Sequence, residues 1–308
     1  MNLFWLKKKG QIKGIFQDPI PFKPLIASGD SSIYFGNDYE SQQYGNYDTE
    51  TCTKFAFTDV METRLTMLEA MNLIPQDTLT WAKANGYKDS VGDWYLSRRW
   101  EGILCGKQNT GDSLNTAYIL AGQVGLIPNS VLPYNLSQAT QDSTLTQFVS
   151  DYFNTSVITP SMRALGQEFL KRFTILGESV DPTLVNIMTY LHEGSLQIAV
   201  PAVAPYWNQV NVPTPGNYTV GNHSVELYKA DFTQDFSDYV FDSYTPKLKQ
   251  LAKQYPIVAM VRLYIWPKPV AIPVPLPQFN FWMSFWFNVY NWIIGKPQMF
   301  PSVPIGGV

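Results

Sequence analysis

Three residues of this 308-residue chain carry the side chains that thiol catalysis needs: Cys52, His223 and Asp242. A thiolate attacks a carbonyl carbon, an imidazole moves the proton, and a carboxylate can fix the imidazole in place. Each residue also has a plain structural interpretation. Cys52 can be a small buried hydrophobe, His223 a solvated turn histidine, and Asp242 a turn-forming aspartate. The sequence around each of them favours the chemical interpretation.

Cys52 stands where a polar, Gly-containing loop gives way to apolar residues at helical spacing. Asp48, Thr49 and Thr51 are N-capping residue types just upstream, so the pattern predicts a helix with Cys52 in its first turn. Unpaired N–H groups and the positive end of the helix dipole favour a thiolate there. The expected apolar face holds Phe55, Ala56, Val60, Met61, Leu65 and Leu68, and the expected wetter face holds Lys54, Glu62, Arg64 and Glu69.

His223 and Asp242 stand at the ends of two predicted strands. His223 begins the alternating run 223–228, after Gly221 and Asn222, and Asp242 ends the run 239–242. Adjacent strands lie about 5 Å apart. The two side chains can therefore meet if both point into the same cleft.

The composition excludes several other classes of function. The formal net charge is −3 and there is no basic block, so nothing in the charge pattern favours nucleic acid. The two cysteines, Cys52 and Cys105, are too few for a disulfide framework. With only His192 and His223 beside them, they cannot form a zinc site, and we expect neither metal nor cofactor. His192 is expected to be structural.

The order of the predicted elements indicates an α+β fold with two lobes. A helix with Leu114, Ala117, Tyr118 and Ala121 on its core face is expected to end at Gly125, and two more helices are expected over 161–173 and 182–191. Strands are expected over 195–204, 223–228, 239–242 and 257–265. The helical lobe is thus placed at about 45–193 and the β lobe at about 195–266. We expect short turns over 81–93 and a short element over 94–100, and residues 135–160 receive no assignment.

The two ends of the chain have their own character. Residues 1–30 are expected to form an extended arm, and the order of apolar and then charged residues at its start reverses that of a secretory signal. Residues 267–308 combine a Pro-rich spacer with an aromatic helix over about 280–294, which is short for a bilayer. We expect this segment, over residues 278–308, to dock on protein partners. The alternatives are membrane contact through residues 279–294 and an ordinary core helix.

Several segments, in order from about residue 22 to 265, resemble the papain-like cysteine peptidases. Residues 48–56 look like the family's nucleophile motif, and residues 109–134 are similar to its segment of Gly-containing turn, helix, Gly and Pro-Tyr. Residues 221–227 resemble the strand that carries the general base. Residues 241–244 resemble the Asn-Ser-Trp block, with Asp242 in place of asparagine. The resemblance implies a papain-like domain over 31–266 with its active-site cleft between the lobes. It also implies that Cys52 is the nucleophile, His223 the base and Asp242 the residue that orients His223.

The oxyanion hole is where the chain departs from this family. The family places a glutamine six residues before the cysteine, and here Asn46 has that position, with Gln42 and Gln43 nearby. A glutamine of this pair is favoured over Asn46, as though the loop were a few residues longer. The Asp-Thr-x-x-Cys and Asp-Ser-Tyr patterns look most like papain-like proteins that tailed bacteriophages encode as virion components.

We therefore expect a thiol hydrolase that cleaves peptide (amide) bonds in a peptide or protein substrate. The resemblance implies a virion- or tail-associated protein, and otherwise one in the cytoplasm of the producing cell. One alternative is a structural virion protein that uses the fold without activity and clasps its neighbours through residues 1–30 and 278–308. Another is a cell-wall amide hydrolase or acyl transferase with the same three residues.

Overall fold

The structure is a computed structural model that describes residues 26, 28–36, 40–44, 47–106, 112–134, 145–218 and 220–268, without the side chains of 43, 44, 47, 145 and 146. By its internal contacts the chain divides into two units, Met1–Lys268 and Pro269–Val308. The predicted Pro-rich spacer, the aromatic helix and most of the N-terminal arm lie outside the described residues.

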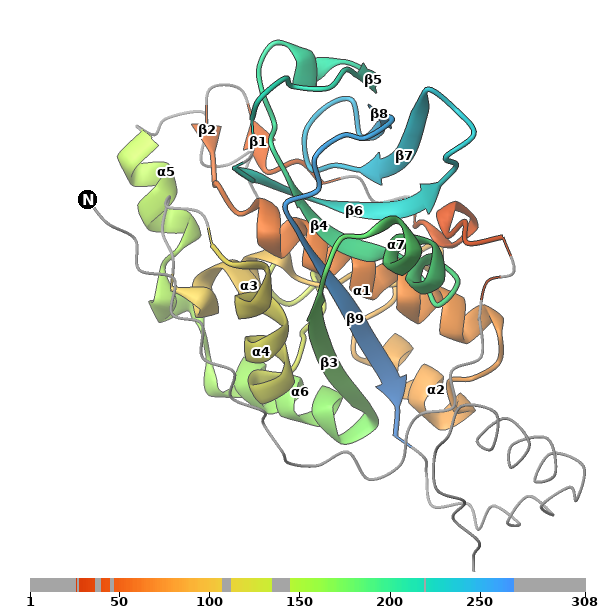
Figure 1. Cartoon of the computed structure of the whole chain (residues 1–308). Coiled ribbons are helices and arrows are strands. Elements are labelled where there is room, and N and C mark those ends of the chain that lie inside the picture. The colour runs from red at the N-terminus through yellow and green to blue at the C-terminus, as the bar shows by residue number, and fades with distance from the viewer. Residues whose placement is uncertain are drawn as a thin grey trace, which may run out of the picture. The chain divides into compact units, whose positions relative to one another are not determined.

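The α-helices of the described chain all lie before residue 192 (Figure 1). Four of them begin after a capping residue whose side chain accepts a backbone N–H group. These residues are Ser97, Ser113, Thr159 and Thr183. The α-helices are α1 (Cys52–Ala70), α2 (Gln76–Ala84), α3 (Arg98–Cys105), α4 (Leu114–Val124), α5 (Leu145–Tyr152), α6 (Pro160–Arg172) and α7 (Leu184–Leu191). Short 3-10 turns are η1 (Ser32–Tyr34), η2 (Thr155–Val157) and η3 (Tyr206–Asn208).

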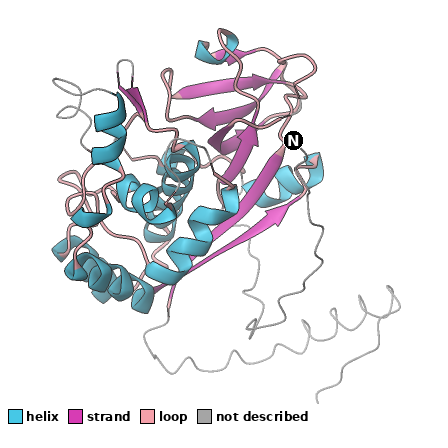
Figure 2. Ribbon diagram, turned by 90° about the vertical axis from the view of Figure 1, so that its left-hand side faces the viewer, coloured by secondary structure: helices cyan, strands magenta, loops and turns pink. Residues whose placement is uncertain are grey.

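The second half forms one sheet, seen with the helices beside it in Figure 2. It has seven strands in the order β3-β9-β4-β6-β7-β8-β5. Neighbouring strands are antiparallel except β5 and β8, which are parallel. The strands are β3 (Phe173–Val180), β4 (Leu196–Val200), β5 (Asn211–Val212), β6 (His223–Ala230), β7 (Phe236–Phe241), β8 (Leu248–Ala252) and β9 (Ala259–Pro267). A small hairpin of β1 (Gln43–Tyr44) and β2 (Tyr47–Asp48) precedes α1. The predicted α+β class is confirmed.

The sheet reaches into the part of the chain that the sequence assigned to helices. β3 lies between α6 and α7, and it pairs with β9 along its whole length, from Phe173 opposite Pro267 to Val180 opposite Met260. The strand was not predicted because residues 173–180 mix Thr, Gly, Glu and Ser with apolar residues. Its pairing with β9 joins the helical part to the sheet.

α1 begins at Cys52, as predicted, and packs against β4, β6 and β9 as well as α3 and α4. The expectation of a wetter face on this helix was wrong, because Lys54, Glu62 and Arg64 are buried. Each is bonded to a distant part of the chain: Lys54 Nζ lies 2.8 Å from Asp112 Oδ2, Glu62 accepts the Leu96 N–H, and Arg64 donates to the backbone oxygens of Glu193 and Ser195. Polar residues on α1 therefore tie elements together instead of facing water.

α4 ends as predicted, at Gly125, and the reason is a close crossing with α6. Gly125 has φ +76°, and a Cβ there would lie 1.8 Å from the Gly166 backbone oxygen. A Cβ on Gly166 would in turn lie 2.3 Å from the Val124 oxygen. Only glycines at both positions allow the two helices to approach this closely.

The segment 81–93 was expected to form short turns, and this was wrong for its first residues. α2 continues through Trp81 to Ala84, and Ala82 is fully buried in the cluster that also contains residues of α1 and β9. The short element expected over 94–100 ends in the first turn of α3. Within the described residues, no helix has the length and apolar character needed to span a membrane.

Candidate active site

The start of α1 places the Cys52 side chain. Cys52 is 8% exposed, and the backbone N–H groups of Lys54 and Phe55 both point to the Thr51 oxygen. Gln197 on β4 donates from Nε2 to the Thr53 oxygen at 2.8 Å, so the neighbouring strand holds the first turn. The thiol therefore lies at the positive end of a 19-residue helix whose position is fixed by the sheet.

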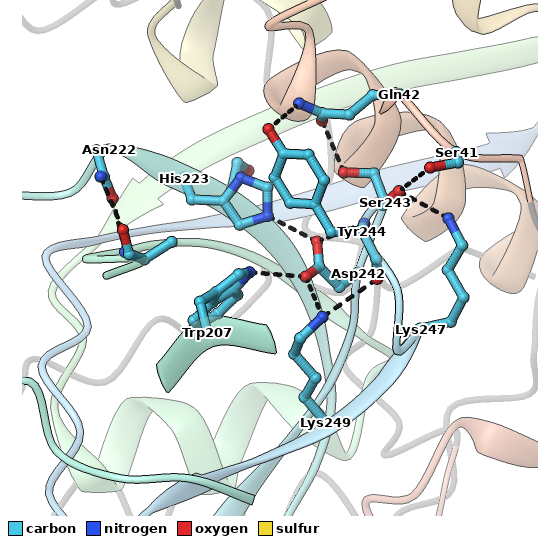
Figure 3. Close-up of polar contacts among 12 residues, drawn as sticks. Ser41, Gln42, Trp207, Asn222, His223, Asp242, Ser243, Tyr244, Lys247 and Lys249 are labelled. Atoms are coloured by element: carbon cyan, nitrogen blue, oxygen red, sulfur yellow. Dashed lines mark hydrogen bonds and ion pairs between the residues drawn. The ribbon is translucent and has the colours of Figure 1, made fainter. Parts of the chain in front are cut away.

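His223 is the first residue of β6, and Asp242 directly follows β7, the strand paired with it. The His223 Nε2–H donates to Asp242 Oδ1 at 2.6 Å (Figure 3). The Cys52 side chain is a second hydrogen-bond partner of the same ring. With Nε2 engaged by Asp242, Nδ1 is the ring nitrogen left for the thiol. The structure thus brings the three residues of the predicted triad together.

The charges in this site favour a protonated imidazole. Burial lowers the pKa of His223, but the Asp242 carboxylate and the Cys52 side chain raise it, to about 10 in all. Burial likewise raises the pKa of Asp242, while His223 and Lys249 lower it below its usual value, so the group is ionised. At neutral pH the His223 imidazolium therefore lies between the Asp242 carboxylate and the Cys52 side chain.

The Asp242 carboxylate accepts four hydrogen bonds from described residues, and the residue is completely buried. Oδ1 accepts from His223 and from the Tyr244 backbone N–H at 3.1 Å. Oδ2 accepts from Trp207 Nε1 at 2.8 Å and from Lys249 Nζ at 2.6 Å. This number of donors explains how a carboxylate stays charged without water.

Two aromatic rings enclose the His223 imidazole. Tyr244 stacks on it with ring centroids 4.8 Å apart, and Trp207 meets it edge-on at 5.3 Å. The rings fix the plane of the imidazole and exclude water from its hydrogen bond to Asp242. Neither Trp207 nor Lys249 was singled out from the sequence.

Signals for these two residues exist in the sequence, but they are weak. Lys249 lies on the same face of β8 as the buried Leu251, a position that strand alternation assigns to the core. β8 itself was not predicted, so strand alternation could not be applied to Lys249. Trp207 lies in η3, between the strands predicted over 195–204 and 223–228, where the sequence predicts no element.

Gln42 is the oxyanion candidate whose side chain the structure describes. Its Oε1 accepts from the Ser243 hydroxyl at 2.7 Å, which fixes the orientation of the amide. Its Nε2 donates to Asp48 Oδ1 at 3.0 Å and to the Tyr244 hydroxyl at 2.7 Å. The amide is therefore buried beside the ring that stacks on His223, with both of its hydrogens engaged.

The other two oxyanion candidates are described less fully. Gln43 lies in β1, where its backbone pairs with Asp48, and Asn46 lies outside the described residues. The Gln43 side chain is not described either, so a role of these two residues in the oxyanion hole stays a prediction.

The remaining cysteine and histidine lie in different surroundings. Burial, together with the charge of Glu101, raises the pKa of the Cys105 thiol to about 12, so this thiol stays protonated. His192 Nδ1 lies 2.8 Å from the backbone oxygen of Ile26, and its backbone oxygen accepts the Ile26 N–H. His192 thus anchors the start of the described chain, which is the structural role expected for it. No group of three or more His, Cys, Asp and Glu side chains suited to a metal ion is present in the described parts of the chain.

Comparisons with known proteins give similarity in structure only. No protein-family model matches the chain, and no curated protein sequence matches it. Among solved structures it is similar to the digestive procathepsin L 3 of the Tenebrio molitor larval midgut, at 15% identity and a TM-score of 0.49, over 80% of this chain and 71% of that one. It is also similar to the bromelain protease of Ananas comosus, at 14% identity and a TM-score of 0.46, over 78% of this chain and 97% of that one.

A third similar structure is the Amb a 11 cysteine protease of ragweed pollen in its proform, at 11% identity and a TM-score of 0.46, over 77% of this chain and 65% of that one. All three are papain-like cysteine proteases. At these identities the chemistry of this chain has to be inferred from its own side chains.

Proposed function

We propose that this chain is a thiol hydrolase that cleaves peptide (amide) bonds through Cys52, His223 and Asp242. One observation supports this most directly. A thiol at the start of a buried helix and a buried carboxylate contact the same imidazole from two sides. This is the arrangement that activates a thiol for attack on a carbonyl.

In the proposed reaction the Cys52 sulfur attacks the carbonyl carbon as a thiolate, and a C–S bond forms. The negative charge that develops on the carbonyl oxygen is met by the Cys52 backbone N–H and by a side-chain amide. His223 gives its proton to the leaving nitrogen, and the C–N bond breaks. Water then attacks the thioester, His223 takes the water's proton, and the C–S bond breaks to release the acid.

Gln42 is our candidate for the side-chain amide in the oxyanion hole. Its Oε1 is held by Ser243, so Nε2 remains directed toward Asp48 and Tyr244. Using it requires a substrate oxygen to replace one of these two acceptors. Gln42→Ala is therefore expected to lower kcat by about 10²-fold, the usual effect of removing one oxyanion donor.

Selective alkylation tests the proposed nucleophile. Iodoacetamide or an epoxide inhibitor at pH 7 is expected to label Cys52 and to leave Cys105, whose pKa is raised to about 12, unlabelled. Cys52→Ala is expected to lower peptide hydrolysis by about 10³-fold or more, and the matched Cys105→Ala variant to keep it. Labelling of Cys105 with a silent Cys52 would contradict the proposal and favour a structural module without activity.

The place of action and the natural substrate are proposals that rest on the sequence. A virion- or tail-associated peptidase follows from the resemblance alone, whereas partners bound through residues 1–30 and 278–308 follow from the composition of the two ends. Hydrolysis of casein compared with purified peptidoglycan separates a peptidase from a cell-wall amide hydrolase. Size-exclusion chromatography of the full chain against one that ends at residue 268 tests the assembly role.

A further inference from the structure

Lys249 is a fourth ionisable residue beside the row formed by Cys52, His223 and Asp242. Lys249 on β8 is 0% exposed, and its Nζ lies 2.6 Å from Asp242 Oδ2, on the far side of the carboxylate from His223 (Figure 3). The order through space is thiol, imidazole, carboxylate and ammonium. Lys249 takes no part in the bond-making and bond-breaking steps of the proposed reaction.

The ammonium group has all of its donors satisfied. Besides Asp242, Lys249 Nζ donates to the Tyr244 oxygen at 3.1 Å and to the Pro246 oxygen. It also lies 5.5 Å from the centre of the Trp207 ring. Lys249 therefore closes the turn that carries Asp242 and Tyr244, both of which touch His223.

The charge balance of the site depends on this lysine. In the attacking state of the proposed reaction, a thiolate, an imidazolium and a carboxylate sum to one negative charge, and a buried net charge is costly. The Lys249 ammonium brings the sum to zero. Burial lowers the pKa of Lys249 and the Asp242 charge opposes this, as expected of an ion pair out of contact with water.

We propose that Lys249 is a positioning residue of the thiol hydrolase site: it shares the Asp242 carboxylate with His223 and limits how strongly that carboxylate holds the imidazole proton. The inference rests on the proposed function. An imidazole that binds its proton too tightly is a poor acid toward the leaving nitrogen. Lys249 thus keeps the proton of His223 transferable while Asp242 still fixes the ring.

Other titratable groups also face this pair and must stay constant in a test. They come from α1, from the hairpin before it, and from the turn that follows β7. They are Cys52, Asp48, Tyr244 and Lys247.

A double-mutant cycle on Asp242 and Lys249 separates this role from plain packing. The variants are Asp242→Asn, Lys249→Met and the two together, and the readout is the titration midpoint of the His223 ring by NMR. Only two histidines are present, so the assignment is simple. Asp242→Asn is expected to lower the midpoint, and adding Lys249→Met to that variant is expected to raise it again by about one pH unit, the usual effect of a nearby charge.

The alkaline limb of the pH–rate profile for peptide hydrolysis is expected to follow the same pattern. The limb is expected to move to higher pH in Lys249→Met, with kcat lowered about tenfold. It is expected to move to lower pH in Asp242→Asn, and back toward the wild-type position in the double variant. Lys229→Met, which removes an equal charge from a partly exposed pair with Asp30, is expected to leave the limb in place.

A merely structural lysine would lower stability without moving the His223 midpoint, and that result would overturn the inference. The midpoint is measured without turnover, so the result is independent of the proposed function. A wild-type chain that neither labels at Cys52 nor hydrolyses peptides would refute the hydrolase, and with it the role of Lys249 in that reaction.

Discussion

At the scale of single residues, the site is a set of buried charges that neutralise one another. Asp242 shows this best, since its two oxygens accept four hydrogen bonds. The donors lie on β6, on β8, in the turn after β7 and in η3. The sequence predicted the three reactive residues from their types and from their places at the ends of elements. It did not predict Lys249 and Trp207, because neither their burial nor their contact with Asp242 is visible before β8 is assigned.

Stability is expected to depend on pH through His223. Its pKa is raised to about 10 in the fold, against roughly 6.5 for a free imidazole. A raised pKa stabilises the fold fully below the unfolded value, and this contribution is lost as the pH rises through the folded value. The difference in free energy of unfolding between wild type and His223→Gln is therefore expected to shrink from pH 6.5 to pH 10.

Urea denaturation at pH 6, 8 and 10 measures that difference. A difference that stays constant over this range would show that the imidazole is not held protonated by the fold.

Glu101 has the same direction of pH dependence for a different reason, because burial without a hydrogen-bond partner, not a nearby opposite charge, raises its pKa. It is fully buried on α3, and neither of its carboxylate oxygens has a hydrogen-bond partner among the described residues. Burial raises its pKa to about 8, although Lys54 opposes the shift. The protonated form is favoured in the fold, so this stabilisation is present below about pH 4.3 and is lost as the pH rises through 8.

Glu101→Gln is thus expected to raise the free energy of unfolding by a few kcal/mol at pH 8 and to change it little at pH 4. Thermal or urea melts at the two pH values test this, with the exposed Glu50→Gln as a matched control. Equal effects at both pH values would contradict a buried, titrating Glu101.

At the scale of elements, helix starts and helix ends were the most predictable features. The spacing of apolar residues, the cap residues and Gly125 predicted α1, α4 and α6 closely, since these signals are local. The faces of the helices were less predictable. α1 is buried on nearly every side, and its charged residues pair with partners that are distant in sequence, such as Asp112 and Glu193. A periodic pattern does not contain that information.

The crossing of α4 and α6 yields a prediction about packing. Gly125→Ala adds a methyl group 1.8 Å from the Gly166 oxygen, so the helices must separate. Gly106→Ala is the control for a positive φ: Gly106 has φ +66° with no atom within 4 Å of its added Cβ, although its ψ is 10° against 177° at Gly125.

We expect Gly106→Ala to cost about 1 kcal/mol for the backbone conformation alone. Gly125→Ala is expected to cost about 1–3 kcal/mol more, the usual cost of overpacking. Urea midpoints of the two variants measure the difference. Equal costs would mean that the crossing relaxes freely.

At the scale of the whole molecule, the site depends on contacts between distant parts of the chain. The start of α1, the start of β6 and the turn after β7 meet because α1 packs along β4, β6 and β9, while β3 pairs with β9. The sequence predicted the class and the order of helices before strands. It could not predict the sheet order, because strand partners are chosen by contacts distant in sequence.

A shortened chain tests how much of the sequence the site requires. Every residue of the candidate site lies within the unit that ends at Lys268. A chain that ends there is expected to keep Cys52 alkylation within about twofold of the full chain, because every described contact of the site comes from within that unit. Loss of labelling together with a lower melting temperature would show that the last forty residues support the fold.

The burial of α1 on nearly every side also sets how the molecule loses function on heating. Amide protons of a helix enclosed by sheet and helices exchange with solvent only when the whole fold opens. We therefore expect α1, which carries the proposed nucleophile Cys52, to be among the last elements to unfold. Hydrogen–deuterium exchange is expected to be slowest along this helix, and heat inactivation is expected to coincide with global unfolding instead of preceding it.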